Sequence, residues 1–151
     1  MREIKCKAWD IKTKKMREVH SISFHNKRDI YHYNESNTPK VINLWGYDII
    51  EQKDIVLHRE SNEVILLEYT GLKDKNGKAI YEGDILKLVL VDWSDVQEDI
   101  FTVSSDNFVE DVCYLKAIVS HAKDVESETD SIEVIGNIYE HKHLLEEKKH
   151  V

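Results

Sequence analysis

The sequence has few of the residues that cross-link a chain, interrupt it or anchor it in a membrane. Its 151 residues include two cysteines, one proline and five glycines, and no apolar run approaches the ~20 residues that span a bilayer. Cys6 and Cys113 are too few and too far apart for a metal knuckle. Both lie in strand-like apolar patterns, which predicts two buried, reduced thiols in a cytoplasmic protein without membrane contact. The first residues alternate charged and apolar side chains, unlike a signal peptide.

The composition is that of a globular protein, but its charge is unevenly distributed. The chain is 41% apolar and 33% charged, and its length suits one domain with a buried core. Residues 1–60 have a balance of +3 and residues 61–151 a balance of −11. Such asymmetry can mark a nucleic-acid or partner surface, or halves that complement each other within one fold or between subunits. We expect one domain over residues 1–151, with possible subdomains 1–60 and 61–151.

Periodic apolar patterns predict strands through most of the chain. Residues 4–8 alternate and residues 16–24 resume the pattern, which indicates a first hairpin. The apolar run 85–91 predicts a central strand. We expect a mainly β fold, α+β at the margins, forming a small curved antiparallel sheet or an SH3-like barrel with hairpins and a short C-terminal helix. Further strands are expected over residues 41–50, 54–58, 63–69, 112–119 and 131–139, with a bulge or strand end at Gly136-Asn137.

The segment 69–86, YTGLKDKNGKAIYEGDIL, places a polar centre between two apolar runs. Asn76 and Gly77 tolerate positive φ, which predicts a tight turn between antiparallel strands. Turn geometry and burial account for the glycines and the apolar residues. The remaining polar side chains exceed what turns require and form a candidate interaction surface: Lys73, Asp74, Lys78, Glu82 and Asp84.

The same segment resembles the signature of the YopX family. The resemblance rests on YTGLKDKNGK at residues 69–78 and IYEGDI at residues 80–85. The opening REIK to AWD at residues 2–10 and the late run EVIGNIYE at residues 133–140 also fit the family, so the resemblance spans essentially the whole chain. YopX-like proteins are small proteins of bacteriophages and prophages without an established biochemical role. The resemblance therefore implies a phage context and a probable fold, and it supplies no catalytic residues.

The strongest charge feature is the acidic stretch 92–111. No Lys or Arg occurs between Lys87 and Lys116. A solvated, variable loop between strands explains this stretch. The alternatives are an acidic surface that docks on a basic partner, such as the basic half of another copy, and imitation of nucleic-acid phosphates to inhibit a host enzyme. The candidate contact residues are Asp95, Glu98 and Asp99.

A basic surface in the N-terminal half supports a nucleic-acid alternative. The first 17 residues contain seven Lys or Arg and two acids. A solvated strand face explains this excess, and a phosphate-contacting surface is the alternative. Aromatic residues mixed with basic ones over residues 26–37 are a combination that single-strand binders use for stacking. The candidate nucleic-acid contacts are Lys12, Lys14, Lys15, Arg28, Tyr31 and Tyr33.

No catalytic constellation is recognisable in the sequence. Residues 74–77 lack the further oxygen ligands of a calcium loop, which leaves a turn. His141 and His143 point to different faces of a helix and are expected to be solvent histidines. Glu82 and Asp84 would form paired carboxylates on one strand face, but no base, nucleophile or metal partner accompanies them. We expect no enzyme activity, cofactor or metal, and a phage accessory protein that binds a protein partner or assembles with itself.

Overall fold

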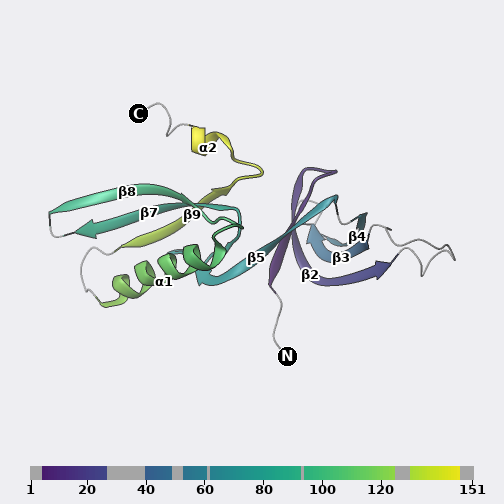
Figure 1. Cartoon of the computed structure of the whole chain (residues 1–151), viewed down its shortest axis with the longest axis horizontal. Coiled ribbons are helices and arrows are strands. Elements are labelled where there is room, and N and C mark those ends of the chain that lie inside the picture. Colours follow the sequence, from purple (N-terminus) through teal and green to yellow (C-terminus); the bar gives the residue numbers. More distant parts are fainter. Residues whose placement is uncertain are drawn as a thin grey trace. The chain divides into compact units, whose positions relative to one another are not determined.

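The computed structural model divides the chain into two compact units, Met1–Glu68 and Tyr69–Val151 (Figure 1). The boundary lies inside strand β5 (Val64–Lys73), later in the chain than the predicted division after residue 60. The structure describes residues 5–26, 40–48, 53–60, 62–92, 94–124 and 130–146. None of the helices in these ranges is long and apolar enough to cross a membrane.

The first unit is an antiparallel sheet whose strands follow the order β4-β3-β2-β1-β5. Cys6 lies opposite Val19 and Asp10 lies opposite Lys15, which confirms the predicted first hairpin. The other side of β1 pairs with the first half of β5, where Asp10 lies opposite Val64. The strands are β1 (Cys6–Asp10), β2 (Lys15–Asn26), β3 (Lys40–Asp48), β4 (Lys53–Glu60) and β5.

The sheet of the first unit is curled. Strand β2 pairs first with β1 and then, from Glu18 onward, with β3, and its register shifts between Val19 and Ser21. A bulge of this kind bends a strand and increases its twist. Arg59 Nη2 on β4 lies 2.9 Å from Asp10 Oδ2 on β1, although two strands separate β4 from β1 in the sheet order. A flat sheet would hold these strands about 14 Å apart, so the sheet must curve to bring them together.

The second unit combines two strand pairings with one long helix. Strand β7 lies at the centre of the sheet β8-β7-β9, as residues 85–91 predicted. Gly136 lies opposite Ile85, whereas Val134 lies opposite Leu86, so Ile135 is the extra residue of a bulge beside the predicted Gly136-Asn137. The elements are the second half of β5, β6 (Ala79–Tyr81), β7 (Asp84–Asp92), β8 (Asp95–Thr102), α1 (Phe108–Asp124), β9 (Ser131–Asn137) and α2 (His143–Glu146).

Helix α1 covers one face of the β8-β7-β9 sheet (Figure 1). The predicted strand over residues 112–119 is therefore wrong. Its buried residues Val112, Leu115 and Ile118 recur every third position, which is the spacing of one helical face. They contact the sheet through a core that includes Leu86 and Ile132. The mainly β, antiparallel class with hairpins and a short C-terminal helix is confirmed, whereas helix α1 was not predicted from the sequence patterns.

The acidic stretch 92–111 is not a loop, which corrects the prediction of a solvated connection. It contains the end of β7, all of β8 and the first turn of α1. Glu110 and Asp111 lie in that first turn, where negative charge complements the helix dipole. Asp111 Oδ2 also accepts a hydrogen bond from the Ser104 N–H at 2.8 Å. Two of the acidic residues in this stretch are thus explained by their position at the N-terminus of α1.

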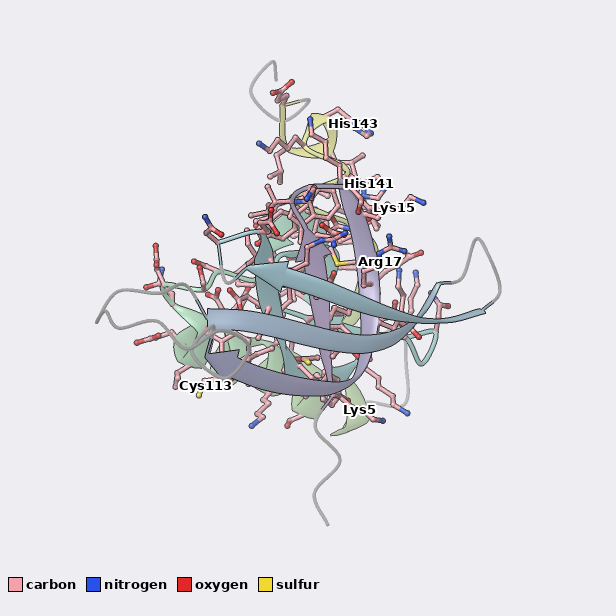
Figure 2. The ribbon with its side chains drawn as sticks, turned by 90° about the vertical axis from the view of Figure 1, so that its right-hand side faces the viewer. Lys5, Lys15, Arg17, Cys113, His141 and His143 are labelled. Atoms are coloured by element: carbon pink, nitrogen blue, oxygen red, sulfur yellow. The ribbon has the colours of Figure 1, made fainter. Side chains whose placement is uncertain are left out.

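The two cysteines have different environments. Cys6 on β1 is half-buried, and burial raises the pKa of its thiol. Cys113 is exposed on α1 (Figure 2), so the prediction of two buried thiols is wrong for this residue. Because residues 112–119 form a helix and not a strand, Cys113 falls on the outward side, between the buried Val112 and Leu115.

Candidate functional site

Buried polar side chains of the segment 69–86 stabilise its own turns. The Thr70 hydroxyl donates to the Ile80 carbonyl at 2.8 Å and accepts from the Leu72 N–H at 3.2 Å. The first bond joins β5 to β6, and the second, within β5, spans Gly71, whose φ is +83°. The predicted turn at Asn76 and Gly77 is confirmed, because residues 74–78 connect the antiparallel strands β5 and β6.

Asp74 accepts hydrogen bonds from three backbone N–H groups. Its Oδ1 accepts from Asn76 at 2.9 Å and from Lys78 at 2.8 Å, and its Oδ2 accepts from Val134 on β9 at 3.1 Å. Burial would raise the pKa of this carboxyl, but the three hydrogen bonds and the charge of Lys78 lower it below its ordinary value. The carboxylate thereby fixes the turn and ties it to β9, which makes Asp74 a folding group.

The predicted pair of carboxylates at Glu82 and Asp84 does not form on one strand face. Glu82 and Gly83 make the turn between β6 and β7, and Asp84 begins β7. Asp84 is buried, and its Oδ2 accepts the Tyr81 N–H at 2.8 Å. The turn requires glycine, because Gly83 has a φ of +79° and a Cβ there would lie 3.0 Å from the Tyr139 ring. The two carboxylates therefore have separate positions and no shared reaction site.

Only some of the polar residues that were predicted to form an interaction surface on this segment are accessible. Lys73 and Lys78 are exposed and Glu82 is half-buried. Asp74 and Asp84 are buried and hydrogen-bonded to the backbone. A contact role stays a prediction for the three accessible side chains.

The acidic candidates lie together on β8, an edge strand of the three-stranded sheet. Asp95, Glu98 and Asp99 are all exposed. Glu98 also forms an ion pair with Lys87 on the neighbouring β7, with 2.9 Å between the oxygen and the nitrogen. Because one extended strand carries all three carboxylates, their spacing is fixed by the backbone. Successive side chains of a strand point to opposite faces, so Asp95 and Asp99 share one face of β8 and Glu98 lies on the other. This edge strand therefore carries negative charge on both faces.

The basic candidates lie on the turn between β1 and β2. Lys12 and Lys14 are exposed, and Lys14 has a φ of +53°. Lys15 is half-buried at the start of β2, which also carries Arg17 (Figure 2). Lys12 Nζ lies 3.8 Å from Glu63 Oε1, a long, exposed ion pair. The other predicted nucleic-acid contacts, Arg28, Tyr31 and Tyr33, lie outside the described residues.

Asp10 holds this basic turn and connects it to β4. Its carboxylate accepts the N–H groups of Lys12 and Thr13 at 3.2 and 3.3 Å and the Thr13 hydroxyl at 2.7 Å. Arg59 Nε and Nη2 donate to the two oxygens of the same carboxylate at 3.1 and 2.9 Å. A two-pronged arginine–carboxylate contact of this kind is stronger than a hydrogen bond between neutral groups. No local pattern predicts this contact, because the partners are 49 positions apart.

His141 is not a solvent histidine, which corrects that prediction. It is half-buried, and its Nδ1 accepts the Asn137 N–H at 3.2 Å. A Cβ at position 136 would lie 2.9 Å from the ring, so Gly136 provides room for the imidazole. His143 is exposed, as expected. Within the described ranges, no group of three or more His, Cys, Asp or Glu side chains is placed to hold a metal ion.

Comparison with known proteins supports the resemblance at residues 69–86. The family model described as YopX protein matches residues 5–146. The chain belongs to the YopX family. No curated protein matches it. The crystal structure of the YopX protein from Bacillus subtilis is similar to this YopX-family chain, with 19% sequence identity, a TM-score of 0.45 and coverage of 95% of this chain and 98% of that one.

The polar residues of this YopX-family protein are of two kinds, buried ones that stabilise the fold and exposed charged ones. The buried polar residues of the signature, Thr70, Asp74 and Asp84, bond to nearby backbone. Accessible charge lies on Lys73 and Lys78 of the signature, on β8 and on the β1–β2 turn. Exposed charges on regular structure are suited to recognition of an oppositely charged surface. Strand β8 and the β1–β2 turn are therefore the candidate functional surfaces.

Proposed function

We propose that this YopX-family protein is a non-enzymatic accessory protein of a bacteriophage or prophage that acts by binding a protein partner or by self-assembly. The observation that carries the proposal is the exposure of Asp95, Glu98 and Asp99 on one edge strand. Three exposed carboxylates on one edge strand attract a basic surface over several ångströms and orient it on contact. The partner is therefore a protein with a cluster of Lys or Arg.

A second copy of the chain offers such a cluster. Lys12 and Lys14 are exposed on the β1–β2 turn, which the Asp10 carboxylate holds in place. Contact between β8 of one copy and this turn of another joins two different surfaces. Contacts of this head-to-tail kind close into rings or extend into chains. Self-assembly through opposite charges can be tested with the purified protein alone.

We expect the wild-type protein to associate reversibly at low salt, and the association to weaken as salt rises from about 50 mM to about 0.5 M NaCl. Neutralising the three carboxylates of β8 with Asp95→Asn, Glu98→Gln and Asp99→Asn should leave a monomer at both salt concentrations. Sedimentation velocity over a range of protein concentrations measures both effects.

A matched control removes the same number of charges elsewhere. Asp106, Glu110 and Glu146 are exposed and lie outside β8. The variant Asp106→Asn, Glu110→Gln and Glu146→Gln should associate as the wild type does. A wild type that stays strictly monomeric at low salt contradicts self-assembly, and equal loss in both variants contradicts the assignment to β8.

Nucleic-acid binding is the second candidate function, and the exposed lysines of the β1–β2 turn favour it. Gel-shift titration with short single- and double-stranded DNA separates the two candidates. Protein binding as the main role predicts no specific shift. Salt-sensitive DNA binding that is lost on reversal of Lys12, Lys14 and Lys15 to Glu would overturn it in favour of nucleic-acid binding.

A further inference from the structure

Strand β8 has the position and composition of a strand that another strand could join. It is eight residues long and lies at the edge of the β8-β7-β9 sheet (Figure 1). Val96 is 54% exposed and Ile100 is half-buried, and β-branched residues favour strand pairing. An edge of this length is a site of strand addition and aggregation unless something blocks it.

The hydrogen-bond register identifies which N–H groups of β8 point away from the sheet. The Val103 N–H donates to the Asp84 carbonyl at 3.1 Å, and the β7–β8 register continues unbroken to Asp92 opposite Asp95. Alternate residues of an antiparallel strand bond to the same neighbour. The odd-numbered residues of β8 therefore bond to β7, and the even-numbered N–H groups point outward. The Val91 N–H on β7 agrees, since it bonds to Asp130 on the other side.

Two of the outward N–H groups are already capped by side chains of β8. The Val96 N–H donates to Asp95 Oδ1 at 2.9 Å, and the Ile100 N–H donates to Asp99 Oδ1 at 2.8 Å. Each carboxylate oxygen takes the place that a carbonyl oxygen of an added strand would occupy. Glu98 differs, because its carboxylate forms the ion pair with Lys87.

We propose that Asp95 and Asp99 lock the β8 edge against addition of a second copy's β8. Pairing of two β8 strands would have to displace both carboxylates from their N–H groups. It would also bring like charges together, which destabilises a strand pair. The lock restricts β8 to contacts through side chains and prevents backbone pairing between copies. It goes beyond the proposed function, which concerns the charge of the β8 side chains.

Two variants separate capping from charge. Asp95→Asn/Asp99→Asn removes both charges but retains an oxygen that can accept from each N–H, whereas Asp95→Ala/Asp99→Ala removes charge and acceptor together. At about 0.5 M NaCl, where charge-driven contacts are screened, the Asn variant should remain monomeric. The Ala variant should associate at least about tenfold more tightly, measured by sedimentation velocity. Amide hydrogen exchange should then slow at the outward positions of the associated Ala variant.

A proline at an outward position tests whether the association uses the β8 edge. Glu98 has an outward N–H, so proline at this position leaves the β7 ladder intact and blocks an added strand. Adding Glu98→Pro to the Ala variant should restore the monomer, which would not happen if partial unfolding caused the association. Glu98→Ala/Asp106→Ala, which removes two charges and leaves both caps, should stay monomeric.

Each outcome decides the proposal. Equal association of the Asn and Ala variants would show that charge alone protects the edge, and would overturn capping. A monomeric Ala variant at high salt would overturn the lock altogether. Both results are independent of the low-salt association of the wild type, so failure of the lock and failure of the proposed function are distinguishable.

Discussion

Replacing Arg59 with Ala is expected to destabilise the first unit by about 3–5 kcal/mol at neutral pH, the usual effect of removing one partner of a buried ion pair. The Asp10 side chain is 0% exposed and the Arg59 side chain is 15% exposed. Without the guanidinium, a buried carboxylate loses its cation and two hydrogen bonds. The loss also removes the contact that joins β4 to β1 across the curled sheet.

Urea denaturation followed by circular dichroism measures this effect. Lys12→Ala is the matched control, because it also removes a cation from an ion pair, the long Lys12–Glu63 contact at the surface. Exposed pairs of this kind contribute about 0–1 kcal/mol. Equal destabilisation by the two substitutions would contradict the role of the Asp10–Arg59 pair.

The same pair predicts an acid dependence of stability. Burial would raise the pKa of Asp10, but hydrogen bonds from Arg59 and Thr13 and the charge of Arg59 lower it to about 2. Because the folded pKa lies below the ordinary value of 3.8, the contribution is complete above 3.8 and is lost as pH falls toward about 2. This shift corresponds to about 2 kcal/mol. In Asp10→Asn the free energy of unfolding should fall less steeply with pH in that window, and an unchanged slope would contradict the assignment.

Replacing Asp74 with Ala should have the second largest effect, a loss of about 3 kcal/mol in the free energy of unfolding. Three backbone N–H groups lose their acceptor, and one of them, on Val134, is held in a strand that is distant in sequence. Asn76 and Lys78 are exposed, so their N–H groups can turn to water, whereas Val134 is half-buried. The main loss is therefore the link between the turn and β9.

Thermal or urea denaturation measures this loss of stability, and a substitution at a neighbouring residue serves as the control. Lys73→Ala changes an exposed residue of the same segment and should alter stability by no more than about 0.5 kcal/mol. Asp74→Asn should lie between the two, because its amide keeps one acceptor oxygen. If Asp74→Ala destabilises the protein no more than Lys73→Ala does, Asp74 has no structural role and its function must be sought elsewhere.

Elements with strong local signals could be predicted from the sequence. The apolar run 85–91, directly after Gly83-Asp84, identified β7, and Asn76-Gly77 identified the turn before β6. These features depend on residues that are close together in the chain. Turn chemistry and β-branched runs carry such information directly.

The remaining features could not be predicted, for one of two reasons. Some depend on contacts between residues that are distant in sequence, and others on whether apolar residues follow the spacing of a helix or of a strand. Residues 112–119 contain enough apolar side chains for a strand, and only burial at Val112, Leu115 and Ile118 distinguishes the helix. Asp74 reaches Val134 across 60 positions. A local sequence pattern does not predict which carboxylate will accept a hydrogen bond from which distant donor. Charge composition identified Asp95, Glu98 and Asp99 as interaction candidates, but only the structure places them on a strand at the edge of a sheet.

The most direct test of a structural role for the YopX signature is amide hydrogen exchange at Val134, Asn76 and Lys78 in the wild-type protein. If the Asp74 carboxylate holds these three groups, their exchange should be at least about 100-fold slower than in an unstructured peptide. Exchange at peptide rates, in a protein whose β7 amides are protected, would contradict it.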